Sequence, residues 1–356
     1  IKIMPMTSPD MTILITMLVF VFVIGSIIGS FLNVVILRAF SGESIVLPPS
    51  KCPKCGNKLK WWHNIPILSY ILLGGKCGFC KEHISFQYPI VEFITGVLFV
   101  MMFIGYGARI ETLFGFAIIA MLMVLSVTDI KECVIFDGHA YALIGTGLVY
   151  SLFRTVVQVI NANQSSLFFT YSWDWFVHSP IVISILGGLT GTLAMLAIYW
   201  LGKLLAGRTA FGEGDIFILA GLGTVFGPKN VLFILLFGAV FQVLFIIPMF
   251  IKSLVQQKDW KLLISLLTLC IFGGLFCWSA YGLFTNDALM YTSMALLVVN
   301  TIYTCVCLIK SIKAEKSVTF VPFGPFLALA GLVALLLPQV FIYLANLFLG
   351  LVGVTF

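Results

Sequence analysis

Long apolar runs recur from one end of this chain to the other, and they constrain its fold more than any other feature. A helix needs roughly 20 apolar residues to cross a hydrocarbon layer of about 30 Å. Only 10% of the residues are charged, against about a quarter in soluble domains. The sequence therefore predicts an all-α, polytopic membrane protein with about ten spans and excludes a soluble domain, a disordered chain and a secreted disulfide scaffold. The runs cover residues 11–37, 88–105, 111–127, 138–156, 180–201, 214–226, 230–251, 262–283, 289–309 and 323–344.

Two of these runs need comment. The run at 214–226 is too short to cross the hydrocarbon alone, so we expect it to draw on flanking residues or to be shielded by protein and water. The first run is too long for the core of a signal peptide, and no small-residue cleavage site follows it. We therefore expect it to remain as a membrane anchor.

Basic residues indicate how the spans are oriented, because cytoplasmic loops collect Lys and Arg. With the N-terminus outside, the loops that alternate into the cytoplasm hold 16 basic residues and the outer side holds four. This uneven partition supports both the orientation and the number of spans, and it puts both termini outside. The inner set is Arg38, Lys51, Lys54, Lys58, Lys60, Lys76, Lys81, Lys131, Lys203, Arg208, Lys252, Lys258, Lys261, Lys310, Lys313 and Lys316, and the outer set is Lys2, Arg109, Arg154 and Lys229.

Four of the nine cysteines lie in a polar cytoplasmic insert, residues 38–87, after the first span. They form two Cys-x-x-Cys pairs, Cys52 with Cys55 and Cys77 with Cys80, and two such pairs can put four thiolates around one Zn²⁺. A reducing cytoplasm disfavours disulfides, which leaves redox chemistry as the alternative to metal. Four thiolates leave no open coordination position, so we expect a structural zinc that folds an insert too small to have a core of its own.

Two acidic residues are expected at the same membrane depth. Asp129 follows an apolar run at its cytoplasmic end, with Asp137 in the same loop, and Asp215 stands in a Gly-x-Gly-Asp sequence with Gly212 and Gly214. Two facing carboxylates in a partly dry site share a proton, so one can act as base and the other as acid toward a water that attacks a carbonyl. The glycines would allow a sharp bend and close approach of a peptide. The alternative is that Asp215 only caps a helix N-terminus.

Several motifs occur in an order that resembles the type IV prepilin peptidase family, the bifunctional leader peptidases and N-methyltransferases of pilins and pseudopilins. The resemblance covers most of the chain and includes the two cysteine pairs, Asp129 with Asp137, and the Gly-x-Gly-Asp sequence. Its other elements are Gly29-Ser30-Phe31-Leu32-Asn33, Asn64-Ile65-Pro66-x-Leu68-Ser69-Tyr70, Gly75-Lys76-Cys77, Tyr88-Pro89-x-Val91-Glu92 and Pro322-Phe323-Gly324-Pro325-Phe326.

The resemblance implies an aspartic endopeptidase in which Asp129 and Asp215 are the catalytic pair and Asp137, Gly212 and Gly214 support it. It implies cleavage of a prepilin or pseudopilin leader at the cytoplasmic face of the bacterial inner membrane, for a type IV pilus or a type II secretion system. It further implies that the cysteine insert serves methylation of the new N-terminus by S-adenosylmethionine, with Lys76 and Glu92 as candidate residues. The expected partners are the prepilin and the lipid bilayer, with no nucleic acid.

The domain organisation that follows is a first helix over residues 1–37, the zinc insert over 38–87 and a transmembrane peptidase domain over 88–356. The family has eight spans, and residues 262–309 are expected to add an extra pair that preserves the sidedness. His63, Gly74 and Gln87 depart from the family pattern inside the insert, which leaves open a peptidase without methyl transfer. A transporter or channel with intramembrane carboxylates, or a non-catalytic assembly partner, is the alternative from a different class, but neither explains the motif series.

Overall fold

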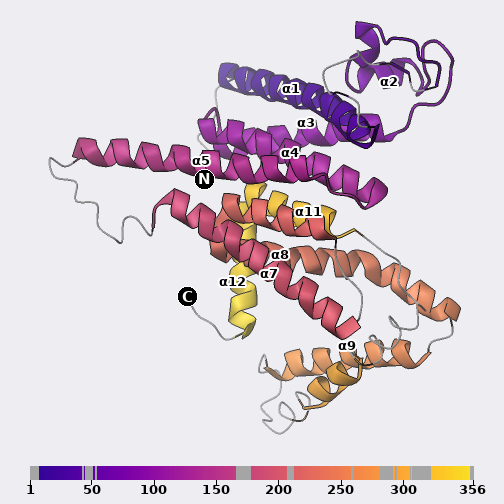
Figure 1. The fold of residues 1–356 in the computed structure, drawn as a ribbon, viewed down its shortest axis with the longest axis vertical. Coiled ribbons are helices and arrows are strands. Elements are labelled where there is room, and N and C mark those ends of the chain that lie inside the picture. The colour runs from indigo at the N-terminus through magenta and orange to yellow at the C-terminus, as the bar shows by residue number, and fades with distance from the viewer. Residues whose placement is uncertain are drawn as a thin grey trace. The chain divides into compact units, whose positions relative to one another are not determined.

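The computed structural model describes residues 8–41, 44, 51–52, 54–165, 178–206, 212–257, 260–280, 292, 295–304, 306 and 322–352. Within these residues the chain is helical, with two isolated β-bridges and no strand. The prediction of an all-α protein is confirmed to that extent. The helices are α1 (Ser8–Ser41), η1 (Trp61–Asn64), α2 (Leu68–Leu72), α3 (Gln87–Tyr106), α4 (Ile110–Glu132), α5 (Asp137–Ser165), α7 (Pro180–Ala206), α8 (Glu213–Gln257), α9 (Trp260–Ala280), α11 (Gly324–Leu336) and α12 (Pro338–Val352) (Figure 1).

Six helices among the described residues are long and apolar enough to cross a membrane, or seven if α11 and α12 are counted as one bent span. The difference from about ten arises in three places. The runs expected at 214–226 and 230–251 both fall within α8, where the non-helical Gly227, with φ 79° and ψ 175°, separates them. The runs expected at 262–283 and 289–309 lie partly outside the described residues, and their described apolar helices, Trp260–Leu269 and Ala295–Thr304, are shorter than a span. The run expected at 323–344 bends by 112° between α11 and α12, because Pro338 cannot continue the hydrogen-bond ladder of the preceding helix.

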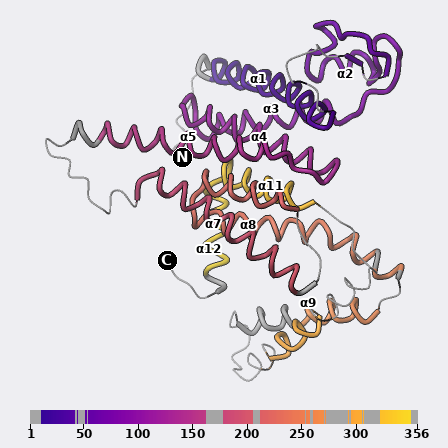
Figure 2. The backbone as a smooth tube through the Cα atoms, in the orientation of Figure 1, coloured from indigo at the N-terminus to yellow at the C-terminus, as the bar shows by residue number. Residues whose placement is uncertain are grey.

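The chain divides into two compact units. The first comprises Ile1–Met195, Gly212–Gly238 and Pro322–Phe356, and the second comprises Leu196–Phe211 and Ala239–Val321. In the first unit, α1, α3 and α4 pack side by side, and α4 also packs against α5 and α11 (Figures 1 and 2). The core of this unit is apolar and includes the fully buried Ile36, Ile118, Leu122 and Leu125.

Small residues set the closest helix contacts of the first unit. A Cβ added at Gly25 or at Gly29 would lie 2.8 Å from the backbone of α3, at Gly96 and at Glu92 respectively. On the other side of the unit, Gly187 of α7 packs directly on the backbone of Gly223 in α8. Between helices in a membrane, such small residues bring backbones together where packing replaces the hydrophobic drive.

The second unit contains part of the expected extra pair, as α9 and a shorter helix over Ala295–Thr304. Polar side chains join the two. The Asn300 amide nitrogen donates to the Thr268 hydroxyl at 3.0 Å and to the Ser265 carbonyl at 3.3 Å, and Thr304 is buried beside them. Hydrogen bonds of this kind hold helices together in a lipid environment, so they explain why these two segments pair.

Candidate functional site

Asp129 lies in the last turn of α4 and is buried, with 4% of its surface exposed. A carboxylate at the C-terminal end of a helix is destabilised by the negative end of the helix dipole, so this position needs a hydrogen-bond donor from another element. The partner is the Gly324 N–H at the start of α11, which donates to Asp129 Oδ2 at 3.0 Å. The N-terminal end of α11 thus supplies the positive potential that α4 lacks at this point.

Asp215 lies in the first turn of α8 and is also 4% exposed. Its Oδ2 accepts the Gly212 N–H at 3.2 Å, and its own N–H donates to the Gly212 carbonyl at 3.2 Å. The first of these bonds is half of a capping box, in which a side chain in the first turn accepts the N–H just before the helix; the other half is absent because Gly212 has no side chain. The capping alternative is therefore partly right, but it uses one oxygen only. Asp215 Oδ1 is buried and has no hydrogen-bond partner among the residues that the structure describes.

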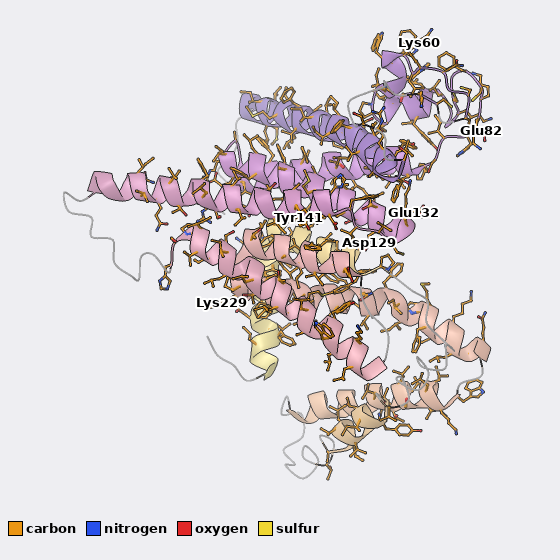
Figure 3. All side chains as sticks on the ribbon, viewed as in Figure 1. Lys60, Glu82, Asp129, Glu132, Tyr141 and Lys229 are labelled. Carbon is orange, nitrogen blue, oxygen red and sulfur yellow. The ribbon has the colours of Figure 1, made fainter. Side chains whose placement is uncertain are left out.

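The two carboxylates meet although 86 positions separate them in the chain. They lie close enough for the charge of Asp129 to act on Asp215. Ile218 in α8 and the carboxylate of Asp129 both reach the space that a Cβ at Gly324 would occupy, so α4, α8 and α11 converge here. Figure 3 shows Asp129 beside Glu132 at the end of α4. Two buried carboxyls in this relation can share one proton and hold a water between them.

The glycines of the Gly-x-Gly-Asp sequence act differently from the expectation. Neither Gly212 nor Gly214 has a positive φ, so neither position requires glycine for a left-handed backbone. A side chain at Gly214 would instead overlap Ile135, in the loop that follows α4. Gly214 therefore lets the start of α8 press against the loop next to Asp129, and Gly212 contributes its N–H to Asp215.

Asp137 is exposed in the first turn of α5, where a carboxylate favours the helix N-terminus. Gly324 has a more direct contact with the pair, and the sequence reasoning gave it no role. The signal that could have identified it is the Pro322-Phe323-Gly324-Pro325 motif, since a glycine next to a proline at the start of a helix allows close approach of another group to the backbone.

The four cysteines of the insert converge as predicted. The sulfur atoms of Cys52, Cys55, Cys77 and Cys80 all lie within 4.8 Å of one another, and Cys52 Sγ is 3.9 Å from Cys80 Sγ. Four sulfurs at about 2.3 Å from a tetrahedral zinc would be about 3.8 Å apart. The cluster therefore has the size and the ligand chemistry that a zinc ion requires.

The two cysteine pairs are held by matching backbone turns. An isolated antiparallel β-bridge joins Lys51 to Lys58 on either side of the first pair, and a second one joins Lys76 to His83 on either side of the second pair. The residue after each second cysteine has a left-handed φ, 70° at Gly56 but 61° at Lys81, where a side chain costs about 1–2 kcal/mol. The backbone N–H groups of Cys80 and Phe79 lower the pKa of the Cys77 thiol to about 6, which favours the thiolate that binds metal.

Glu92 and Lys76, the candidates for methyl transfer, have very different surroundings. Glu92 is buried in α3, and its Oε2 accepts the Ile67 N–H of the insert at 2.8 Å. Ser30 of α1 adds a side-chain hydrogen bond. The carboxylate thus ties the insert to α1 and α3. Lys76 is exposed on the second cysteine turn.

Comparison with known families gives two matches. The N-terminal part, residues 23–106, matches the family described as the bacterial Peptidase A24 N-terminal domain. Residues 116–247 match the type IV leader peptidase family. The first match contains the cysteine insert, and the second contains both Asp129 and Asp215.

Curated relatives agree with these matches. A prepilin leader peptidase/N-methyltransferase of Klebsiella pneumoniae is 31% identical over 214 residues, which cover 58% of this chain and 84% of the relative. The protein of the same name from Neisseria gonorrhoeae is 33% identical over 229 residues, covering 58% of this chain and 72% of the relative. No solved structure matches the chain.

Proposed function

The chain belongs to the type IV leader peptidase family, and from that premise we propose that it cleaves the leader of prepilin-like substrates with Asp129 and Asp215 and methylates the new N-terminus. The observation that carries the proposal is the buried pair itself. Both carboxylates are removed from solvent, their charges interact, and one oxygen, Asp215 Oδ1, has no partner within the described part of the chain. A buried carboxylate oxygen without a donor is costly unless it binds a proton or a water.

The chemistry needs one ionised and one protonated carboxyl. The ionised carboxylate takes a proton from the water, and the water oxygen attacks the scissile carbonyl. The protonated carboxyl gives its proton to the carbonyl oxygen. When the tetrahedral intermediate collapses, the C–N bond breaks and the first group returns its proton to the leaving amine. The hydrogen bonds from Gly324 and Gly212 each fix one oxygen of a carboxylate, which leaves the other oxygen of each to hold the attacking water.

We assign the insert to methyl transfer and propose that its four cysteines hold a structural zinc. The sulfur spacing supports the zinc, because structural zinc sites are tetrahedral and four cysteines are one of their usual ligand sets. S-adenosylmethionine would supply the methyl group when bound, and the new amine of the substrate would accept it. Glu92, with its contacts to Ile67 and Ser30, would hold the insert against the membrane domain, and Lys76 remains a candidate for contact with the cofactor.

The membrane setting completes the proposal. The apolar helices support a multi-pass bacterial membrane protein, and the distribution of basic residues supports an active site at the cytoplasmic face. We propose the division into a first helix (1–37), an insert (38–87) and a peptidase domain (88–356), with the inserted pair in 262–309 outside the catalytic part.

The experiment is to incubate the purified protein with a prepilin, with and without S-adenosylmethionine, and to weigh the products by mass spectrometry. Loss of the leader mass is expected in both samples, and an added methyl group only with the cofactor. Intact prepilin in both samples would contradict the peptidase assignment. Cleavage without an added methyl group would contradict the methyltransferase assignment alone.

A further inference from the structure

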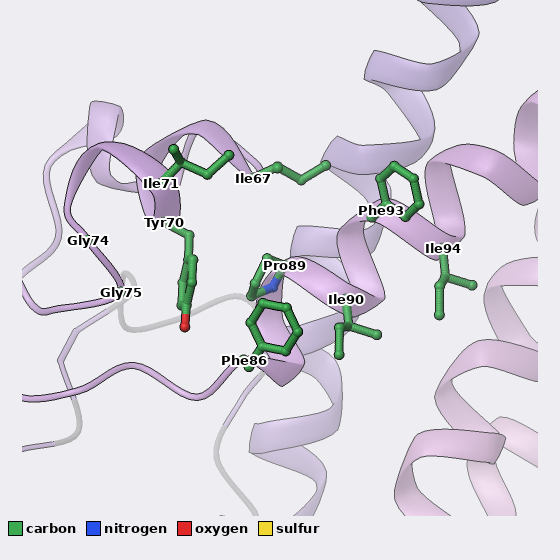
Figure 4. A pocket seen from close by; sticks show the side chains of 10 residues that line it. All are labelled: Ile67, Tyr70, Ile71, Gly74, Gly75, Phe86, Pro89, Ile90, Phe93 and Ile94. Carbon is green, nitrogen blue, oxygen red and sulfur yellow. The ribbon is translucent and has the colours of Figure 1, made fainter.

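A pocket of about 530 Å³ lies where the insert meets the first turns of α3. Its volume is within the roughly 300–1,000 Å³ of ordinary ligand pockets. Tyr70 and Ile71 of the insert form one wall, and Phe86, Pro89 and Ile90 at the start of α3 form the other (Figure 4). The pocket is separate from the aspartate pair, whose residues do not line it.

The chemistry of the walls excludes a polar ligand. The Tyr70 hydroxyl is already engaged with the Ile84 carbonyl, at 3.3 Å. The N–H of Ile67 is donated to Glu92, and those of Gly74 and Gly75 are donated to the carbonyls of Ile71 and Tyr70. With these donors engaged and the rest of the lining formed mainly by apolar side chains, the pocket is poorly suited to the charges of a nucleotide or of S-adenosylmethionine. It suits a hydrocarbon chain.

The position of the pocket indicates where that chain comes from. Phe93 and Ile94 line its far end and are exposed on α3, which is one of the candidate membrane spans. The apolar surface continues onto α2, where Ile71 is 65% exposed and Leu72 is 82% exposed. Apolar surface that runs from a span onto a short helix is typical of an element lying in the membrane interface, so the neighbour of the pocket is lipid.

The charge of the insert selects the kind of lipid. Residues 51–86 contain six lysines and one acidic residue, Glu82, and they remain basic even after the negative charge that a four-thiolate zinc site adds. Lys76 directly follows Gly74 and Gly75 on the pocket wall and is exposed. Lysines near a membrane surface attract anionic headgroups.

We infer that this pocket is a binding site for an anionic phospholipid, with one acyl chain against Tyr70, Ile71 and Phe86 and the phosphate near Lys76. A lipid bound there would join the cysteine insert to the bilayer beside α3. The site is distinct from the catalytic pair, and its occupancy does not depend on the peptidase activity.

Native mass spectrometry of the full chain in detergent tests the site, with phosphatidylglycerol and phosphatidylcholine of the same acyl chains as probes. We expect one tightly held phosphatidylglycerol, preferred over phosphatidylcholine by about fivefold, as one lysine contact would give. Ile71→Ser should weaken its binding by about tenfold, and Lys76→Gln should remove the preference. Leu72→Ser is the matched control, because Leu72 is adjacent and exposed but does not line the pocket.

A second matched pair guards against misfolding in α2. Phe93→Ser should weaken lipid binding, whereas Ile104→Ser, which is exposed on the same helix outside the pocket, should not. Equal effects within either pair, equal binding of the two lipids, or absence of retained lipid would overturn the inference. Displacement of the lipid by stoichiometric prepilin would also overturn it and would assign the pocket to the substrate.

Discussion

The Gly324→Ala variant separates the chemistry of the carboxylate pair from the packing of the helices around it. A Cβ at this position would lie 2.6 Å from Asp129 Oδ2, so the carboxylate has to move by several tenths of an ångström or more. The present hydrogen bond from Gly324 N–H is 3.0 Å long, and at about 3.6 Å it would no longer count as one. The substitution therefore removes the contact that orients Asp129.

Hydrogen bonds to charged groups contribute about 1.5–3 kcal/mol, and each 1.4 kcal/mol of lost transition-state stabilisation is about tenfold in rate. We therefore expect kcat for prepilin cleavage to fall about 10- to 100-fold. The KM should change little, because Gly324 contacts the carboxylate and not the substrate. Initial rates over a range of prepilin concentrations, read by gel shift, give both constants, and thermal unfolding gives the stability.

Gly331→Ala is the control, because it lies on the same helix and its Cβ would also lie 2.6 Å from a neighbour. That neighbour is Leu222 Cδ2, the end of a flexible side chain, so the expected effect is overpacking that lowers stability by about 1–3 kcal/mol, with kcat within about threefold of the wild type. An equal fall in kcat in both variants would mean that packing of α11 is responsible. Unchanged kcat in Gly324→Ala would refute the role of the hydrogen bond.

Three further predictions concern the insert. One zinc per chain should be found by elemental analysis and lost in the Cys52→Ser, Cys55→Ser double variant; undiminished metal would exclude these ligands. Lys81→Gly should raise the stability of the insert by about 1 kcal/mol, because the φ of 61° at this position suits glycine. Gly56→Ala should lower the stability, so thermal unfolding should give changes in melting temperature of opposite sign for the two variants. Glu92→Gln keeps an oxygen for the Ile67 N–H and should retain methyl transfer, measured with S-adenosylmethionine, whereas Glu92→Ala should loosen the insert to limited proteolysis. A folded but methylation-inactive Glu92→Gln would instead indicate that the charge itself is required.

The sequence was sufficient for features that depend on composition or fixed spacing. The apolar runs predicted the helical membrane protein, and the Cys-x-x-Cys pairs predicted that four sulfurs converge, because two residues between cysteines already fix a turn around a common centre. The motif series predicted the family. The alternation of spans also predicted a common depth for Asp129 and Asp215, which stays a prediction, and both side chains are buried in the fold.

Features that depend on contacts between distant segments were not predictable from the pattern. The Gly324 hydrogen bond joins residues 195 positions apart, and no local rule connects the start of one helix with the end of another. The Gly-x-Gly-Asp pattern predicts backbone freedom at Gly212 and Gly214, but in the fold a side chain at Gly214 would overlap Ile135, which is distant in the sequence. The bend of 112° before Pro338 was not predictable for the same reason, since an apolar run does not show how a helix ends.

The most direct test of the central claim is the rate of prepilin cleavage by Asp129→Asn and Asp215→Asn, with Asp137→Asn as the control. Asparagine keeps the size of the side chain but cannot act as an acid or a base near neutral pH. Either of the first two substitutions should reduce the rate by several orders of magnitude while thermal unfolding stays near that of the wild type, because the volume of the side chain is unchanged. Asp137→Asn, at an exposed position, should retain most of the activity. Undiminished cleavage by either Asp129→Asn or Asp215→Asn would contradict the assignment of this pair.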